Sequence, residues 1–392
     1  MSLLTIINMP QRIKVAYLDY SHVFAGAERV LHTILSTLDR EKFEPVLVFP
    51  FPMEHQKGYD DIKCGRIYLA DGLKWWMGSK RWNNPVKGTD FMARTIWGVR
   101  LAYQLKRRGI GILHVNLLRP DALMWLLPAR SAGIRIIGHF RSQELEWIAP
   151  PYVQHQCNQI LCVSEYSRNR MLTKGIHTPS RVLYDSIETS RFQKQISKTE
   201  ARKALGLNVD AEILASVGQL SVHKGHDNAI RALAILAEKR PNMILFIAGG
   251  GGVSNKYLKD ILEENPAIKH RVIFSDGQIA DIQNVYIAAD LTLSLSRGGE
   301  GFGLIPYESA LCGTPFIGPN QGAILEFIID NENGMLVDTY SPEAIAAKID
   351  WALEHRAITQ AMVTQTKQLI EDRLTPEVMI MELQAVYSEL MN

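Results

Sequence analysis

Cysteine is scarce in this chain: the 392 residues include four, and none of them forms a C-x-x-C pair or has the spacing of metal ligands. Such scarcity argues against a disulfide-stabilised fold and indicates a reducing compartment. No apolar run approaches the ~18 residues that a membrane-spanning helix requires. Residues 1–10 lack the basic start and the small-residue cleavage site of a secretory signal. We therefore expect a cytoplasmic protein.

Neither sign of charge is in excess, because 43 Lys and Arg stand against 41 Asp and Glu. The two halves of the chain nevertheless differ. Residues 1–190 hold 25 basic and 16 acidic residues, and residues 191–392 hold 18 and 25. This asymmetry could help the two halves meet, or could attract an anionic partner. The basic residues form no long stripe and accompany no recognition motif, so nucleic-acid binding is not expected.

The length predicts two domains, because 392 residues exceed one ordinary core. Strand-like apolar runs alternate with helical stretches in both halves, which predicts parallel β-α-β units. The predicted strands are Ile13–Leu18, Pro45–Phe49, Gly111–Val115, Arg135–Gly138 and Gln159–Val163, then Ile213–Val217, Met243–Ala248, Val272–Phe274 and Leu291–Ser296.

The pattern breaks at a polar segment, residues 186–196, which suits a linker. Ser197 and Glu200 then have the spacing of a capping box, and Gly206 could close the helix that follows. We therefore expect a first domain over residues 1–188 and a second over 189–375. An amphipathic helix is expected within residues 376–392. Doubly wound domains bind ligands at the carboxyl ends of their strands.

The most specific motif is a glycine-rich loop, residues 296–303, between a predicted strand and a predicted helix. Glu300 lies in the loop and Glu308 on the helix, so both carboxylates can point toward the carboxyl end of the strand. Backbone amides at such a helix start suit hydroxyls or anionic oxygens. These amides belong to Phe302, Gly303 and Leu304. A glycine loop with two solvated glutamates is the alternative.

Glu300 and Glu308 match the E-x7-E signature of retaining glycosyltransferases with the GT-B fold, and the surrounding run resembles family four of that class. The resemblance covers nearly all of residues 213–338 and implies an α/β fold of two Rossmann-like doubly wound domains facing a central cleft. Other matching segments are Val217–Leu220, Lys224–Gly225, Phe246–Gly250, Asp276–Gly277, Ala288–Asp290, Gly313–Pro315 and Glu326. Looser matches in the first half are Ala25–Glu28, His139 and Val163–Glu165. The resemblance further implies that the helix within residues 376–392 packs back against the first domain.

The resemblance also implies roles for single residues. Lys224 would meet the negative charge that grows on the departing diphosphate. Glu308 would bind the ribose hydroxyls, Glu300 would lie near the donor sugar, and Gly26 would allow close approach to the diphosphate. The implied donor-binding residues are Gly26, Gly218, Gln219, Lys224, Gly277, Gln278, Ile279, Glu300, Phe302, Gly303, Leu304 and Glu308; the implied catalytic residues are Lys224, Glu300 and His139. Lys224 could instead be an ordinary surface lysine, and His139 a satisfied core residue.

The implied reaction moves a sugar from a nucleoside-diphosphate sugar to a hydroxyl acceptor with retention, without a metal, a cofactor or a dedicated base. Consistently, the chain has no D-x-D triplet. The expected acceptor is a glycan or a lipid-linked intermediate of polysaccharide or lipopolysaccharide biosynthesis. A nucleotide-sugar 2-epimerase, a sugar phosphorylase and a non-catalytic scaffold partner that binds the sugar nucleotide are the alternatives.

Two departures from the family pattern bear on activity. Gln219 replaces the arginine beside the diphosphate, and His223, His226 or Arg297 could compensate for the missing cation. Residues 185–188 replace an N-G-V-D turn.

The glycines at 249–252 lack the spacing of a dinucleotide fingerprint, which argues against a nicotinamide enzyme.

Aromatic and basic residues gather in one stretch of the first half. The helix predicted over Phe91–Arg108 follows it and ends in three basic residues. This combination suits an anionic membrane surface, or stacking against an acceptor sugar. A loop folded over its own core would explain the pattern equally. The residues are Lys74, Trp75, Trp76, Lys80, Arg81 and Trp82.

Overall fold

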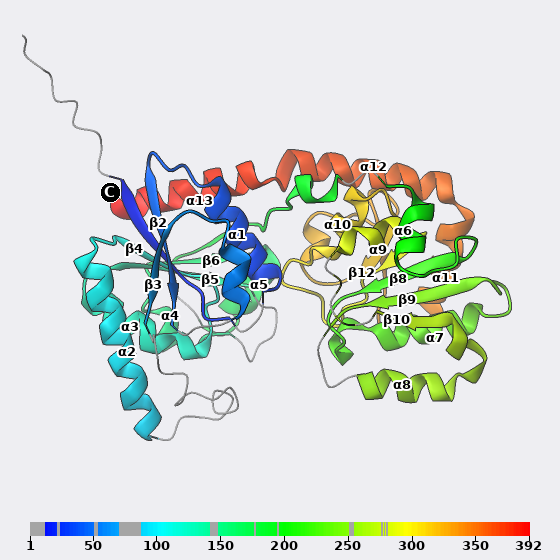
Figure 1. The fold of residues 1–392 in the computed structure, drawn as a ribbon, viewed down its shortest axis with the longest axis horizontal. Coiled ribbons are helices and arrows are strands. Elements are labelled where there is room, and N and C mark those ends of the chain that lie inside the picture. Colours follow the sequence, from blue (N-terminus) through cyan, green and yellow to red (C-terminus); the bar gives the residue numbers. More distant parts are fainter. Residues whose placement is uncertain are drawn as a thin grey trace, which may run out of the picture. The chain divides into compact units, whose positions relative to one another are not determined.

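The computed structural model describes residues 12–21, 24–50, 54–69, 88–141, 148–175, 178–193, 196–250, 255–275, 277, 279 and 281–392. The chain divides into two compact units. Unit 1 comprises Met1–Ser186 and Pro376–Asn392, and unit 2 comprises Ile187–Thr375. Each unit is built around one parallel sheet with helices on both faces (Figure 1).

Unit 1 has a seven-stranded sheet in the order β3-β2-β1-β4-β5-β6-β7. The strands are β1 Ile13–Leu18, β2 Phe43–Phe49, β3 Gly65–Tyr68, β4 Ile112–Val115, β5 Arg135–Phe140, β6 Gln159–Cys162 and β7 Ser180–Val182. The helices are α1 Gly26–Thr37, η1 Glu54–Tyr59, α2 Gly88–Arg107, η2 Pro120–Ala122, α3 Leu123–Ser131, α4 Pro151–Gln154, α5 Glu165–Leu172 and α13 Pro376–Met391.

Alternate residues of β1 enter two different cores, because successive side chains of a strand point to opposite faces. Leu18 packs with Trp125 and the helices α2 and α3. Tyr17 packs on the other face with Leu31 of α1 and Tyr387 of α13. The chain thus returns to unit 1 at its C-terminal end, and α13 covers the face that α1 covers (Figure 1).

Unit 2 has a six-stranded sheet in the order β10-β9-β8-β11-β12-β13. The strands are β8 Glu212–Val217, β9 Met243–Ala248, β10 Val272–Phe274, β11 Leu291–Leu293, β12 Phe316–Pro319 and β13 Met335–Val337. The helices are η4 Thr189–Phe192, α6 Lys198–Ala204, η5 Val222–Lys224, α7 His226–Leu236, α8 Asn255–Glu264, η6 Pro266–Arg271, α9 Ile282–Ala288, α10 Ile305–Leu311, η7 Ala323–Glu326, α11 Pro342–Glu354 and α12 Arg356–Arg373.

The predicted strands are confirmed, most of them with ends shifted by one or two residues, although β11 stops at Leu293 rather than Ser296. The capping box is also confirmed: the Glu200 amide donates to Ser197 Oγ at 3.2 Å, and the Ser197 amide donates to Glu200 Oε2 at 2.8 Å. The short strands β3, β7, β12 and β13 were not predicted. No described helix has the length and apolar character that crossing a membrane demands.

Candidate functional site

The strand order of unit 2 reverses direction between β8 and β11, which are neighbours in the sheet but far apart in sequence. From β8 the chain continues outward to β9 and β10, and from β11 it continues to β12 and β13 on the other side. Such a reversal separates the two loops that leave the carboxyl ends of the adjacent strands, and ligands of open α/β sheets bind there. Residues 218–225 and 294–304 form these loops.

Lys224 and Glu300 meet at this point. Lys224 Nζ lies 2.6 Å from Glu300 Oε1, and the Ser296 hydroxyl donates to the same oxygen. The two charged side chains are 22% and 17% exposed, so both remain open to a ligand. Burial raises the pKa of Glu300, but Lys224 and Ser296 outweigh it and hold that pKa below its usual value. Glu300 is therefore an ionised carboxylate.

Glycines on both sides of this ion pair let the backbone approach it closely. A Cβ atom on Gly218 would lie 3.4 Å from Lys224 Cδ, and one on Gly303 would lie 3.3 Å from Glu300 Oε2. Gly303 also has φ of +83°, a conformation that L side chains rarely adopt. The predicted residues Gly218, Lys224, Glu300 and Gly303 thus lie together.

Arg297 ties the glycine loop to the turn that carries Lys224. Its backbone amide donates to His223 O at 2.8 Å, and its Nη1 donates to Val222 O at 2.8 Å. Its Nη2 pairs with the buried carboxylate of Asp227 at 2.5 Å. These bonds fix the loop relative to η5 and hold Lys224 within reach of Glu300.

Glu308 lies on α10 and is 8% exposed. The Tyr286 hydroxyl, on α9, donates to Glu308 Oε2 at 2.7 Å. This bond fixes the rotamer of the carboxylate. Leu304 is the N-cap of α10 and accepts the Glu308 amide through its carbonyl at 3.0 Å. Phe302 is buried, with its ring 5.6 Å from that of Tyr307.

Hydrogen bonds join the loops after β9 and β10. The Gly249 amide donates to Ser275 Oγ at 3.1 Å, and Ser275 Oγ donates to Gly277 O at 2.9 Å. Gly277 has φ of +77° and open space where a side chain would stand. Ile279 is partly buried in the apolar cluster beside α9. Gln278 lies outside the described residues.

The remaining predicted residues belong to unit 1. Gly26 is exposed and is the first residue of α1. His139 is fully buried on β5, and its Nδ1 faces Arg141 and His114. Gly26 follows strand β1, and His139 lies on strand β5. Both strands belong to the sheet of unit 1, whereas Lys224 and Glu300 belong to unit 2.

Of the three side chains that could compensate for Gln219, His226 and Arg297 have identified partners in unit 2. His226 is buried, its pKa is lowered to about 4 by burial, and its Nδ1 bonds to Ser216 Oγ at 2.7 Å. Arg297 holds Asp227 and the loop. His223 lies beside the glycine loop, where a Cβ atom on Gly298 would be 4.0 Å from its Cε1. Gln219 itself is exposed.

The predicted site did not include Tyr286, Asp227 or Arg141, although each of them fixes a predicted residue or loop. Tyr286 lies 22 positions before Glu308 and Asp227 lies 70 before Arg297. No spacing rule connects residues so far apart. Arg141 lies two positions after His139, where strand alternation places both side chains on one face. That signal could have indicated the pair.

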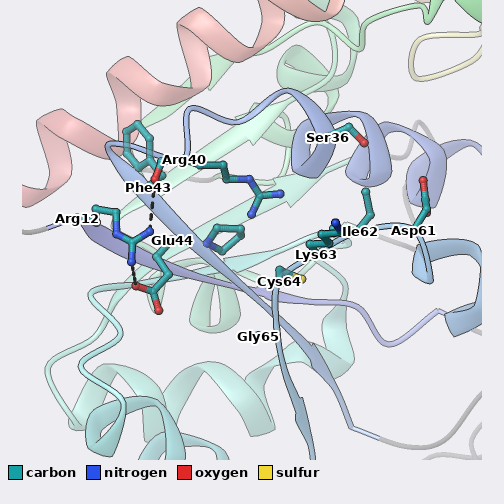
Figure 2. Close-up of a pocket in the computed structure, with 11 residues that line it drawn as sticks. Arg12, Ser36, Arg40, Phe43, Glu44, Asp61, Ile62, Lys63, Cys64 and Gly65 are labelled. Carbon is teal, nitrogen blue, oxygen red and sulfur yellow. Dashed lines mark hydrogen bonds and ion pairs between the residues drawn. The ribbon is translucent and has the colours of Figure 1, made fainter.

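A separate cavity of about 540 Å³ lies in unit 1 at the amino ends of β2 and β3. Figure 2 shows Arg12, Arg40 and Lys63 among its lining residues, with Arg12 paired to Glu44 at 3.2 Å. This cavity contains none of the predicted site residues, because those follow the carboxyl ends of the strands. Among the described residues, no group of three or more His, Cys, Asp or Glu side chains is arranged to hold a metal ion.

Two protein families match the chain. Residues 197–369 match the glycosyl transferases group 1, and residues 24–191 match glycosyltransferase family 4. A D-inositol 3-phosphate glycosyltransferase of Mycolicibacterium gilvum is 26% identical over 301 residues, which cover 75% of this chain and 59% of that protein. The lipopolysaccharide core biosynthesis mannosyltransferase LpsB of Rhizobium meliloti is 30% identical over 167 residues, or 41% of this chain and 47% of LpsB. The chain thus spans about three fifths or less of these relatives.

Among solved structures, HepE of Anabaena in complex with UDP and glucose is similar, with a TM-score of 0.80 and 18% identity. The match covers 96% of this chain and 100% of HepE. At this identity the likeness shows the fold, which is two Rossmann-like domains of the GT-B type.

Proposed function

Because the chain belongs to family 4 of the GT-B glycosyltransferases, we propose that it transfers a sugar from a nucleoside-diphosphate sugar to a hydroxyl acceptor. The observation that carries the proposal is the Lys224–Glu300 pair at the switch point of unit 2. A cation and a carboxylate held side by side suit a leaving diphosphate and the hydroxyls of the sugar attached to it.

Unit 2 binds the donor in this proposal. The diphosphate lies at Lys224 and at the backbone of Gly218, where no side chain obstructs it. The ribose hydroxyls donate to Glu308, whose second oxygen Tyr286 already holds. The donor sugar lies against Glu300 and Gly303. The base lies near Gly277, where the structure leaves open space.

Transfer proceeds with retention and without a metal ion in this proposal, with the departing phosphate oxygen taking the proton of the acceptor. The E-x7-E spacing of Glu300 and Glu308 supports retention. The acceptor is a glycan or lipid-linked intermediate of cell-surface polysaccharide biosynthesis. The similarity to LpsB, named as a lipopolysaccharide core mannosyltransferase, supports that setting.

A thermal-shift screen with UDP, GDP, ADP and CMP tests the donor site. A nucleotide at a hundred times its dissociation constant adds about 2.7 kcal/mol to the free energy of unfolding. We expect one diphosphate to stabilise the wild type and to stabilise neither Glu308→Ala nor Lys224→Ala. Lys239→Ala is the matched control, because Lys239 also pairs with a carboxylate of unit 2, Asp350, but precedes the amino end of β9.

The diphosphate that binds then selects the sugar nucleotides for an activity assay. Transfer to an acceptor, or slow hydrolysis of the donor, supports the proposal. Nucleotide binding without transfer or hydrolysis would favour the scaffold alternative. Release of an isomerised sugar with free nucleotide and no acceptor would indicate the epimerase.

The protein docks on an anionic membrane surface in this proposal, and helix α2 carries the argument. Ile96, Val99 and Tyr103 are 66%, 56% and 63% exposed and lie on one side of the helix, beside exposed Arg100 and Lys106. On the opposite side of the helix, Leu101 and Leu105 pack into the core of unit 1. An apolar stripe with adjacent cations suits a headgroup region with anionic lipids. Trp75, Trp76 and Trp82, for which the same role was predicted, lie outside the described residues.

Co-sedimentation with phosphatidylglycerol vesicles at low salt tests the docking. Wild-type protein is expected in the pellet, and Val99→Glu is expected in the supernatant. Ile358→Glu is the control, since Ile358 is 48% exposed on α12 of unit 2. Equal pelleting of both variants, or no pelleting of the wild type, would contradict docking through α2.

A further inference from the structure

Arg141 follows β5 in unit 1, and its side chain is 4% exposed. Its Nη1 pairs with Asp185, and its Nε donates to Asn116 O at 3.2 Å. Burial of a charge is unfavourable unless it is paired and hydrogen-bonded, and these two partners meet that need. The remaining nitrogen, Nη2, lies 3.1 Å from Nδ1 of His139.

This contact determines which nitrogen of His139 carries the proton. A guanidinium only donates hydrogen bonds, so Nδ1 of His139 accepts. Burial, together with the charge of Arg141, holds the pKa of His139 well below its usual value, so the ring is neutral. A neutral ring with an accepting Nδ1 has its proton on Nε2.

The assignment continues through His114 to the C-terminal helix. His114 Nε2 lies 3.3 Å from the same Nδ1 of His139, so Nε2 of His114 donates. Burial lowers the pKa of His114 to about 3, which keeps this ring neutral as well. Its Nδ1 then accepts from the Tyr387 hydroxyl at 2.6 Å. Each of the contacts that link Arg141, His139, His114 and Tyr387 thus pairs one donor with one acceptor.

One atom of the chain remains without a partner. Nε2 of His139 is buried and has no hydrogen-bond partner among the residues that the structure describes. Buried donors in folded proteins are normally paired, and an exception marks a place where a ligand can supply the acceptor.

We propose that Arg141 is a positioning residue that fixes His139 as the tautomer with its proton on Nε2, the nitrogen left to donate to an oxygen of a ligand. Tyr387 does not set this order, because its hydroxyl can donate to Nδ1 of His114 or accept from it. The identity of the ligand rests on the proposed function, whereas the tautomer does not depend on it.

Nitrogen NMR of the full-length chain labelled with 15N-histidine tests the tautomer. His139→Asn and His114→Asn variants assign the ring signals. The wild type is expected to show Nε2 protonated and Nδ1 unprotonated in both rings. Arg141→Met combined with Asp185→Asn removes both members of the ion pair, so no buried carboxylate is left unpaired. In this double variant His139 is expected to lose its preference for the Nε2 proton.

Tyr387→Phe tests the order of the chain with a smaller change. We expect both rings to keep the proton on Nε2, because Arg141 still donates to Nδ1 of His139 and that atom still accepts from His114. Tyr17→Phe is the control, since Tyr17 lies in the same buried cluster, 5.4 Å from the ring of His114, and its change leaves the bond from Tyr387 in place. Unchanged His139 signals in the double variant, or loss of the fixed His139 tautomer in Tyr387→Phe, would overturn the proposal.

Turnover of the sugar nucleotide gives the functional readout. We expect kcat/KM of the double variant to fall about tenfold or more, as the loss of one oriented hydrogen bond implies. The dissociation constant of the free nucleoside diphosphate, which lacks the sugar, is expected to stay unchanged. A wild-type protein that binds no nucleotide would refute the proposed function, and the NMR result would stand separately.

Discussion

Lys224 Nζ lies 2.6 Å from Glu300 Oε1, although the two residues are 76 positions apart in sequence. The family resemblance implies a different part of the donor for each, the diphosphate for the lysine and the sugar for the glutamate. Without ligand they neutralise each other at the switch point of unit 2. A bound diphosphate would compete with Glu300 for the lysine.

Lys224→Met should therefore destabilise unit 2 by about 2 kcal/mol, between the values for exposed and for fully buried ion pairs. The cost arises because Glu300 keeps its charge in a part-buried site without a counter-ion. Urea unfolding, followed by pulsed hydrogen exchange of the β8 peptide, measures the loss.

The double variant Lys224→Met with Glu300→Gln serves as the control, because it removes both charges. It should recover about half of the lost free energy, as expected when two residues interact directly. Strictly additive losses in the double-mutant cycle would show that the two side chains do not interact in solution.

Tyr286→Phe should weaken the binding of a nucleoside diphosphate about three- to tenfold and lower the free energy of unfolding by about 1–2 kcal/mol. The hydroxyl that donates to Glu308 Oε2 is lost, so the carboxylate is no longer held in one rotamer before the ligand binds. Isothermal titration calorimetry measures the affinity. Tyr307→Phe removes a buried hydroxyl from α10 but leaves the Tyr286 bond in place, and it should bind like the wild type.

Local patterns predicted the fold well because they report local physics. The apolar runs of β1 and β9 are continuous and bounded, and the structure confirms both at the predicted residues. The capping box that begins at Ser197 is complete within four residues, so it can be recognised from the sequence alone. Strand β13 contains three residues and lies at the sheet edge, too short for a pattern to stand out.

The candidate site was predictable only where a motif is contiguous. The glycine loop and its two glutamates form one segment, and the family resemblance supplied the roles. The contacts that fix them join residues distant in sequence, such as Arg141 and Asp185, which are 44 positions apart. A pattern cannot reveal such a pair, since it depends on how β5 and the segment after β7 lie in the sheet.

The same limit applies to Asp290, the last residue of the A-A-D element. The structure gives it a structural part: Asp290 accepts from the Ile213 amide at 2.8 Å and pairs with Arg202 at 2.8 Å and Lys198 at 3.0 Å. Burial raises its pKa, but the bonds from Ile213, Lys198 and Arg202 outweigh burial and lower the pKa below its usual value.

A lowered folded-state pKa makes the stability of unit 2 depend on acid. The stabilisation is complete above the unfolded-state pKa of about 3.9 and is lost as the pH falls through the lower folded-state value. Asp290→Asn should cost about 2 kcal/mol at pH 7 and should flatten the fall in unfolding free energy between about pH 5 and pH 2. Asp350→Asn is the control, because Asp350 is 19% exposed against 9% for Asp290 and should change the profile less. Unfolding midpoints in urea, followed by hydrogen exchange of the β8 peptide at each pH, show whether the two variants differ in this way.

Gly299 and Gly313 allow the glycine loop to be tested with two substitutions of equal chemistry. Both residues have positive φ, +76° and +83°, so alanine at either position costs about 1–2 kcal/mol in backbone conformation. The surroundings differ: a Cβ atom on Gly299 would lie 2.6 Å from the Cα of Gly322, whereas one on Gly313 would meet nothing within 4 Å. Backbone cannot move aside as a flexible side chain can. Gly299→Ala should therefore displace the loop that carries Glu300 and abolish nucleotide stabilisation in the thermal-shift assay, and Gly313→Ala should retain that stabilisation at a slightly lower melting temperature. Equal nucleotide responses of the two variants would show that the close approach of Gly299 and Gly322 does not hold the loop in place.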